Sequence, residues 1–381
     1  MSMETTIWRT PGEYLARMGA QEPVLFFAPE VLQQTARRFQ DGFAGLVTYA
    51  VKANPDPLVI DNLAAAGINA FDVASPEEIR LIRRRVPGAA LHYNNPVRSR
   101  REIAEGVAAG VVSWSVDSES ELDKLFAQLP SRDNEIAVRF KLPVKGAAYD
   151  FGAKFGAMPD RAAALLGRAV ARGHAGALTF HPGTQCADPA AWATYIRAAA
   201  GIAAQAGVRL ARLNVGGGFP SHRAAGDAPA LEEIFAVIAA ETKAAFGAQA
   251  PELVCEPGRA MVAEAFTLAC EVRAVRDDGD VFLNDGIYGA LSESPLLGAP
   301  GRIEVRRADG TLRDGPVRPR VVFGPTCDSV DRLPGMIELP ADIAEGDVLL
   351  LRGMGAYSTV TNTRFNGFGA LSIAMVRASG G

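Results

Sequence analysis

Between about residues 46 and 256, short runs of β-branched and apolar residues alternate with longer amphipathic stretches, and this alternation constrains the fold more than any other feature. The apolar runs have the length and composition of buried strands; they cover residues 46–51, 69–73, 90–94, 111–115, 135–141, 176–181, 211–215 and 252–256. The stretches between them predict helices at residues 56–66, 76–85, 98–109, 118–128, 159–172, 188–207 and 229–246. Eight strands that alternate with helices over ~210 residues predict an α/β fold of the (β/α)8 type, a TIM-like barrel.

Beyond about residue 265 the pattern changes to strands and tight turns. Strands are predicted on both sides of the turn Asp277–Asp280 and before the turn Asp309-Gly310. The predicted strands cover residues 265–275, 281–284, 302–307, 320–323, 347–352 and 371–376, and no helix is expected among them. We therefore expect a barrel at residues 27–264 and a C-terminal all-β domain at residues 265–381, to which residues 1–26 also contribute.

Composition narrows the possible partners. The 39 Lys and Arg residues against 43 Asp and Glu residues give a net charge of −4 and no basic excess, which argues against nucleic acid or an anionic membrane as partner. Neither a signal peptide nor an apolar run of about 18 residues is found, so export and membrane insertion are not expected. The four cysteines are widely spaced, which predicts reduced thiols in the cytoplasm.

In a barrel, function collects at the C-terminal ends of the strands, so the polar residues that follow each apolar run are the candidate site residues. They form a short set, namely Lys52, Asp72, Arg139, His181, Gly216–Gly218 and Glu256. A lysine that follows a buried strand lies where desolvation favours the amine nucleophile, although a lone rim lysine is more simply explained as a side chain that reaches to solvent. Arg139 is equally compatible with a local ion pair.

The glycines favour an anion site. Gly216–Gly218 follow the seventh strand and Gly258 follows the eighth, where barrels commonly bind a phosphate through backbone amides. Alone, three glycines indicate only a tight loop. Together with Lys52 they indicate pyridoxal phosphate, because that cofactor has an aldehyde for an amine and a phosphate for a glycine loop.

Two further side chains fit the same cofactor. A carboxylate such as Glu256 keeps a pyridine nitrogen protonated, and His181 can stack on the ring, although a hydrogen-bonded core histidine is equally consistent with the pattern. The four histidines lack the spacing of metal ligands, so no metal site is predicted.

Ten motifs in order along the chain resemble the fold type III, alanine-racemase-like pyridoxal-phosphate decarboxylases. The resemblance is to the ornithine, diaminopimelate and arginine decarboxylase family, and within it to the eukaryotic-type ornithine decarboxylases. The motifs are Tyr49-Ala-Val-Lys52, Phe71-Asp-Val-Ala-Ser75, Lys154-Phe-Gly156, His181, Gly216-Gly-Gly-Phe-Pro220, Glu256-Pro-Gly-Arg259, Asn284-Asp-Gly-Ile-Tyr-Gly289, Gly324-Pro-Thr-Cys-Asp-Ser-Val-Asp331, Gly355-Ala-Tyr357 and Phe365-Asn-Gly-Phe368.

The resemblance implies a role for each candidate residue. Lys52 would form the Schiff base with pyridoxal 5'-phosphate, His181 would stack on the ring, and Glu256 would bind the pyridinium. Asp72 and Arg139 would form a polar layer around Lys52. The phosphate would be bound by Gly216, Gly217, Gly218, Gly258, Arg259 and Tyr357, with Thr184 nearby.

The resemblance also implies a head-to-tail homodimer with two shared sites. Cys327 would reach into the partner's site and protonate the α-carbon of a quinonoid intermediate, and Asp328, Tyr288 and Phe365 would contact the substrate. Lys154 and Asp331 would form an ion pair between the two chains. The implied reaction is the decarboxylation of a basic L-amino acid, ornithine or lysine, to the diamine.

One position departs from the ornithine decarboxylase pattern. Ungapped counting puts Leu297 where a second acid is expected to grip the distal ammonium, and losing it would weaken that pairing by on the order of 2–5 kcal/mol. Glu293 is a candidate replacement if the loop shifts. Otherwise the substrate is an amino acid with a different distal group.

Two other functions are compatible with parts of the pattern. The first is a non-catalytic regulator of the antizyme-inhibitor type, which the presence of both Lys52 and Cys327 disfavours. The second is an amino-acid racemase on the same barrel, which Cys327-Asp328 disfavours because that pair belongs to the decarboxylase pattern.

Overall fold

The computed structural model describes residues 6–129, 134–142 and 154–378. By contacts the chain divides into two compact units, each described here by itself. The barrel unit consists of Thr35–Pro220 and Pro229–Ala260. The β unit consists of Met1–Gln34, Ser221–Ala228 and Met261–Gly381.

The barrel unit is built on one parallel sheet with the strand order β3-β11-β10-β9-β8-β7-β6-β5-β4 among the described residues. The strands are β3 (Leu46–Val47), β4 (Tyr49–Ala50), β5 (Ala70–Val73), β6 (Ala90–Tyr93), β7 (Ser113–Val116), β8 (Glu135–Arg139), β9 (Ala175–Thr179), β10 (Arg212–Asn214) and β11 (Glu252–Cys255). Only Thr48 separates β3 from β4, and its N–H and hydroxyl both donate to the carbonyl of Cys255 at 2.9 Å. Because β3 pairs with β11 and β4 pairs with β5, these two short strands are one broken strand that closes the sheet, and the predicted barrel is confirmed.

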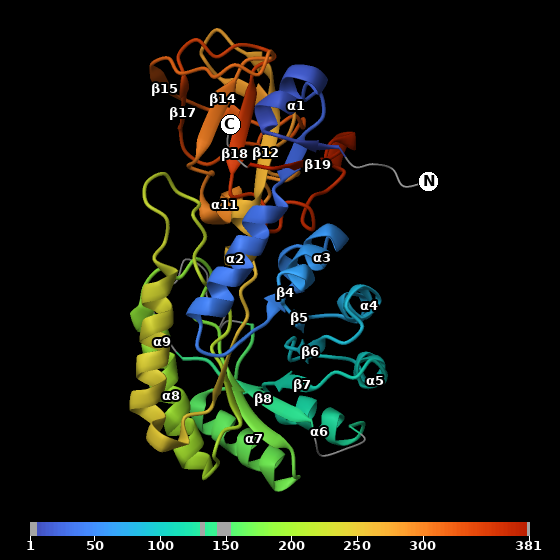
Figure 1. Ribbon diagram of the computed structural model, residues 1–381, viewed down its shortest axis with the longest axis vertical. Helices are drawn as coiled ribbons and strands as arrows, with labels where there is room; N and C mark the ends of the chain where they lie inside the picture. Colours follow the sequence, from blue (N-terminus) through green and yellow to red (C-terminus); the bar gives the residue numbers. More distant parts are fainter. Residues whose placement is uncertain (1–5, 130–133, 143–153, 379–381) are drawn as a thin grey trace. The chain divides into compact units, whose positions relative to one another are not determined.

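Helices follow the strands as predicted. They are α3 (Pro57–Ala65), α4 (Pro76–Arg85), α5 (Arg100–Ala108), α6 (Glu119–Phe126), α7 (Pro159–Ala171), α8 (Pro189–Ala206) and α9 (Leu231–Phe246). Figure 1 shows α3 to α6 following one another along the outside of β4 to β7. Several begin at a side-chain cap: the hydroxyls of Ser75, Ser99 and Ser118 each accept from the N–H three residues later.

A helix whose residues belong partly to the β unit and partly to the barrel unit is absent from the sequence prediction. Helix α2 covers Pro29–Gly42, and Leu32, Ala36 and Phe39 on it are fully buried. Their spacing of four and three residues is that of one helix face, so the periodic signal was present in the sequence.

The β unit is organised around the long strand β12 (Phe266–Val275), which pairs with β2 (Val24–Phe27), β18 (Val348–Arg352) and β13 (Val281–Leu283). The remaining strands are β1 (Ile7–Trp8), β14 (Ile303–Arg306), β15 (Val317–Arg320), β16 (Val322–Phe323), β17 (Ile337–Pro340) and β19 (Ser372–Val376). The rings of Phe27 and Phe266 stack with centroids 4.6 Å apart across the β2–β12 pair. Helix α1 (Pro11–Met18) covers this sheet through Leu15.

The prediction that no helix interrupts the β region is wrong in detail. A one-turn helix, α11, covers Ser294–Leu297, and a 3-10 turn covers Phe365–Gly367. Pro295 suits the first turn of α11 and the left-handed Gly298 ends it, so these local signals stop the chain from extending. Strand β17 was also missed, because Glu338 and Pro340 interrupt its apolar pattern.

Within the described ranges, no helix is both long enough and apolar enough to cross a membrane. All four cysteines are free thiols, of which Cys255 and Cys270 are buried and Cys327 is exposed.

Candidate active site

Lys52 lies at the C-terminal end of the first barrel strand, in the 3-10 turn Val51–Ala53 that follows β4. Its Nζ is 3.9 Å from Oδ2 of Asp72, and Asp72 is only 3% exposed. Burial raises the pKa of Asp72, and the charges of Lys52 and Arg139 oppose that rise. The expectation that Lys52 is desolvated by the strand is not met in this chain, because its side chain is 49% exposed.

Glu256 follows β11 and is buried at the same end of the barrel. Its Oε1 accepts from the amide of Asn94 at 2.6 Å and from the amide of Asn214. Burial and the charge of Asp72 raise the pKa of Glu256 to about 7, against the opposing effect of Lys52. The two asparagines were missed among the candidates, although both stand at the ends of predicted strands and the strand-end rule applies to them equally.

The glycine run packs against His181. Gly216 and Gly218 have φ values of +70° and +84°, the left-handed region that favours glycine. A Cβ on Gly218 would lie 2.1 Å from the carbonyl oxygen of Gly183, and one on Gly217 would lie 3.4 Å from His181 Nε2. The loop therefore presents bare backbone beside the imidazole.

His181 is half-buried, and its surroundings desolvate the ring. Burial, followed by the charges of Arg139 and Lys52, lowers the pKa of His181 well below its usual range. Its Nδ1 accepts from the N–H of Gly183 at 3.2 Å. The imidazole is therefore neutral at physiological pH.

Arg139 ends β8 and joins the same group. Burial lowers its pKa, and Glu256, Asp117 and Asp72 oppose that shift, so these charges lie close enough to interact. The guanidinium also lies 5.4 Å from the ring centroid of Phe155.

Glu78 is a further residue that the sequence analysis missed. It lies on α4, and its Oε2 accepts from the N–H of Ala74 at 2.6 Å. Burial raises the pKa of Glu78 to about 7, and the charges of Asp72 and Lys52 also act on it. Its sequence signal is the capping position three residues after Ser75, which indicates a structural role and hides the proximity to Asp72.

The remaining barrel candidates lie shortly after the strands at this end. Gly258 follows β11, where a Cβ would lie 3.0 Å from the Cβ of Ala53. Arg259 begins the short helix α10 (Arg259–Val262) and is 9% exposed. Thr184 lies on the loop after β9.

Five candidate residues belong to the β unit and are described there. Tyr357 has a left-handed φ of 66°. The hydroxyl of Tyr288 donates to Oδ2 of Asp328 at 2.5 Å, which lowers the pKa of Asp328 and keeps it charged at neutral pH. The ring of Tyr288 lies 4.7 Å from that of Phe365, and the N–H of Cys327 donates to Asn366 Oδ1 at 3.1 Å.

Asp331 is held by hydrogen bonds within its own unit. Its residue is 1% exposed and its carboxylate accepts hydrogen bonds from Ile287 and Thr326 of the same unit. The ion pair between Lys154 of one chain and Asp331 of the other stays a prediction.

Asp285, whose pKa is affected by burial and also by the charge of Asp331, should make the stability of the protein depend on pH. Its carboxylate accepts from the N–H groups of Gly286 and Ala290, and burial raises its pKa to about 7. A carboxyl group with a raised pKa binds more protons in the folded state than in the unfolded state. Its contribution to the free energy of unfolding is therefore complete below about pH 4 and is lost as the pH rises through about 7. Thermal unfolding of Asp285→Asn should therefore depend less on pH between about 5 and 8 than that of the wild type.

The control for this prediction is Asp328→Asn, because Asp328 is half-exposed and its pKa is lowered. That variant should keep the wild-type dependence between about pH 5 and 8, since a lowered carboxyl pKa acts on stability only at lower pH. Equal pH slopes for the wild type and Asp285→Asn would contradict the prediction.

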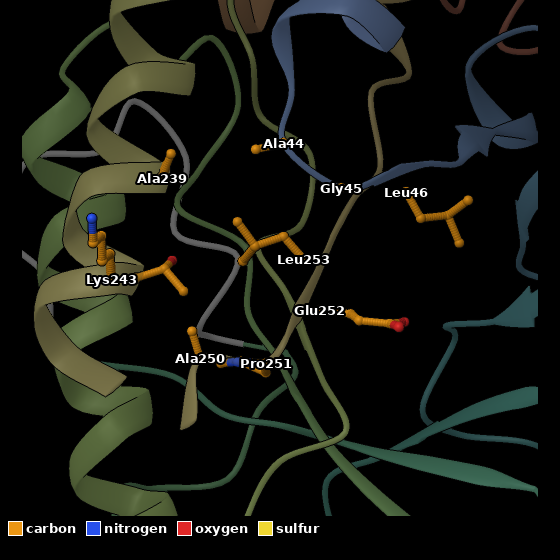
Figure 2. Close-up of a pocket in the computed structure, with 10 residues that line it drawn as sticks. Ala44, Gly45, Leu46, Ala239, Lys243, Ala250, Pro251, Glu252 and Leu253 are labelled. Atoms are coloured by element: carbon orange, nitrogen blue, oxygen red, sulfur yellow. The ribbon is translucent and has the colours of Figure 1, made fainter. Parts of the chain in front are cut away.

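A separate hollow lies at the opposite end of the barrel strands (Figure 2). It has a volume of about 340 Å³, and its lining includes Leu46 at the start of β3 and Glu252 at the start of β11. The rest of the lining consists of Ala44, Gly45, Ala239, Thr242, Lys243, Ala250, Pro251 and Leu253. Because the candidate residues gather at the other strand ends, this hollow is distinct from the candidate active site.

Comparison with known proteins agrees with this geometry. The family model described as "Pyridoxal-dependent decarboxylase, pyridoxal binding domain" matches residues 30–263. Ornithine decarboxylase 2 of Drosophila melanogaster is 32% identical over 336 residues, covering 84% of this chain and 82% of the relative. The lysine/ornithine decarboxylase of Selenomonas ruminantium is 32% identical over 341 residues, covering 84% of this chain and 81% of the relative.

A solved structure matches nearly the whole chain. The lysine/ornithine decarboxylase of Vibrio vulnificus, in complex with cadaverine, superposes with a TM-score of 0.82 and 28% identity. The match covers 96% of this chain and 96% of that one, so it includes both units.

Proposed function

Because this chain belongs to the pyridoxal-dependent decarboxylases, we propose that it removes the carboxylate of a basic L-amino acid, ornithine or lysine, and releases the diamine. The enzyme class and the cofactor, pyridoxal phosphate, follow from the family. The proposal adds the substrate and the roles of individual residues. The observation that carries these roles is the buried carboxylate of Glu256, held by two amides at the same barrel end as the amine of Lys52.

The residues fit this cofactor chemically. An amine, a carboxylate with a raised pKa, a neutral imidazole and a run of bare glycine backbone stand at one end of the barrel. Lys52 would hold the cofactor covalently, and Gly216, Gly217, Gly218, Gly258 and Arg259 would hold its phosphate, with Tyr357 and Thr184. When bound, the cofactor supplies a ring that accepts the electron pair of the bond to the departing carboxylate.

The barrel side chains would orient the bound cofactor and keep its ring nitrogen protonated. A carboxylate with a pKa near 7 exchanges a proton readily at neutral pH, so Glu256 would share a proton with the ring nitrogen of the bound cofactor. Asn94 and Asn214 fix the direction of that carboxylate. The neutral ring of His181 would stack on the bound cofactor without adding a positive charge beside its protonated ring nitrogen. Asp72 and Arg139 balance the charge around Lys52.

The β unit would complete the site of a second chain. In this proposal the thiol of Cys327 delivers a proton to the α-carbon, and Asp328 pairs with the distal ammonium of the substrate beside Tyr288 and Phe365. A head-to-tail homodimer is supported by the exposed apolar side chains Val330 (58%), Phe365 (41%) and Phe368 (42%), which suit burial against a partner. The proposed domains are a barrel at residues 27–264 and a β domain at residues 1–26 and 265–381.

The distal group of the substrate would be recognised by the β-unit residues around Asp328. Asp328 supplies one carboxylate, and Leu297 stands where the ornithine decarboxylase pattern has another. A substrate with a different distal group is the alternative, and Glu293 is the second acid in the same segment. A non-catalytic regulator and a racemase are further outcomes of the tests.

Incubation with a panel of amino acids identifies the substrate. Holoenzyme is incubated with ornithine, lysine, arginine and norleucine, and the amine products are identified by mass. We expect the diamine from ornithine or lysine to form with the highest kcat/KM. Turnover of norleucine that equals or exceeds that of both cationic substrates would overturn the proposed substrate class.

Glu256→Gln tests the role of the buried carboxylate. Glutamine has a similar shape but binds no proton at neutral pH, so kcat should fall by about 10²–10³-fold. The cofactor absorbance should persist because Lys52 remains. The matched control is Glu252→Gln at the other end of the same strand, whose side chain is 77% exposed and which should keep wild-type kcat. A Glu256→Gln enzyme with wild-type kcat would contradict the role of Glu256.

A further inference from the structure

Asp331 is a buried carboxylate that the proposed chemistry does not use. Its Oδ1 accepts from the N–H of Ile287 at 2.9 Å. Its Oδ2 accepts from the N–H and the hydroxyl of Thr326 at 3.0 and 2.8 Å. A carboxylate that accepts hydrogen bonds from two segments about 40 residues apart links those segments.

The backbone of Asp331 closes the second of these segments into a loop. Its N–H donates to the carbonyl oxygen of Asp328 at 3.0 Å, and its own carbonyl oxygen accepts from the N–H of Gly324 at 2.8 Å. Residues 324–331, which we call the Cys-Asp loop, thus fold back on Asp331. Cys327 lies on the exposed side of this loop.

Two glycines make room for the carboxylate. A Cβ on Gly286 would lie 2.1 Å from Oδ1 of Asp331, and a Cβ on Gly324 would lie 2.3 Å from the same oxygen. Both distances are far below any van der Waals contact. The carboxylate is therefore enclosed by backbone on both sides, and it cannot move without displacing one of the two segments.

The two linked segments carry the two partners of one hydrogen bond. Tyr288 follows Ile287 directly, and Asp328 lies on the Cys-Asp loop. The Tyr288 hydroxyl donates to Asp328 at 2.5 Å. A shift of either segment would therefore move the Asp328 carboxylate relative to the tyrosine that orients it.

We propose that Asp331 is a positioning residue for substrate recognition, which joins the Cys-Asp loop to the Tyr288 segment and so fixes where Asp328 presents its charge. The inference rests on the proposed function, in which Asp328 pairs with the distal ammonium. In Asp331→Asn one oxygen becomes an NH₂ group that faces backbone donors, so at least one link is lost. The loop then relaxes, and the pairing at Asp328 weakens because it depends on distance and direction.

The test measures recognition of the distal ammonium by binding. Cofactor-loaded wild type and Asp331→Asn are titrated calorimetrically with 1,5-diaminopentane and with 1-aminopentane, which lacks the second amine. In the wild type, 1-aminopentane should have the larger dissociation constant, because it lacks the second ammonium. We expect the ratio of its dissociation constant to that of 1,5-diaminopentane to fall by about tenfold or more in Asp331→Asn. A role in folding alone would reduce the amount of active protein and leave this ratio unchanged, and that result would overturn the proposal.

Two further variants keep the test decisive if Asp331→Asn does not fold. Thr326→Val removes one hydrogen bond to Asp331 and should lower the ratio by a smaller factor, whereas Thr326→Ser keeps the hydroxyl and should restore it. Equal ratios for these two variants would also overturn the proposal. Asp309→Asn, in an exposed turn of the same unit, controls for the loss of one negative charge.

Asp328→Asn separates this inference from the proposed function. If it lowers the ratio and Asp331→Asn does not, the role of Asp331 fails while that of Asp328 stands. If Asp328→Asn leaves the ratio at the wild-type value, the assignment of Asp328 fails, and the inference that depends on it fails as well.

Discussion

Replacing Lys52 with alanine should abolish turnover, with a loss of kcat of about 10³-fold or more, because it removes the amine that stands beside Asp72 and would hold the cofactor. The same variant should lose the covalent link. After borohydride reduction and proteolysis, the peptide with Lys52 should carry the added mass of the reduced cofactor in the wild type. The corresponding peptide of the alanine variant should be unmodified.

Lys52→Arg is the matched control for charge. Arginine keeps a cation near Asp72, so the local charge balance is preserved, but its guanidinium stays protonated and cannot bond to an aldehyde. This variant should be as inactive as Lys52→Ala while it unfolds closer to the wild-type temperature. Substantial turnover by Lys52→Arg would show that the lysine acts only through its charge.

Mixing two inactive variants should restore activity if each site takes Lys52 from one chain and Cys327 from the other. Lys52→Ala and Cys327→Ala are each expected to be nearly inactive. Random exchange in a twofold dimer makes half of the dimers hybrid, and each hybrid has one intact site, so about a quarter of wild-type activity should appear.

The control for mixing uses two substitutions that the proposal places in one site. Lys52→Ala mixed with Glu256→Gln should show no recovery, because both residues belong to the barrel unit of one chain. No recovery from Lys52→Ala with Cys327→Ala, in a sample shown by mass to contain hybrids, would contradict the shared site.

The barrel was predictable because its signals are local. Each strand and helix is defined by a short window of sequence, and the strand-end rule follows from parallel strands alone. That rule found Lys52, Asp72, Arg139, His181 and Glu256, and the structure brings them together. It applied equally to Asn94 and Asn214, which were passed over because uncharged amides suggest no chemistry until the carboxylate they hold is visible.

The strand pairing of the β unit could not be predicted from local sequence patterns. Strand β2 pairs with β12 across more than 200 residues of intervening chain, and no local pattern encodes such a pairing. The setting of Asp331 depends on contacts with Gly286 and Gly324, so its burial is a tertiary property. The half-exposed state of Lys52 likewise depends on packing around the strand end, which the sequence pattern alone does not report.

The most direct measurement follows the carboxylate carbon. Holoenzyme is incubated with L-lysine or L-ornithine labelled with ¹³C at the carboxylate, and labelled carbon dioxide, the diamine and the remaining amino acid are quantified together. One labelled carbon dioxide should form for each diamine, and the remaining substrate should keep its optical activity. Racemised substrate without carbon dioxide, or a cofactor-loaded protein that leaves every amino acid of the panel unchanged, would contradict the proposed decarboxylation.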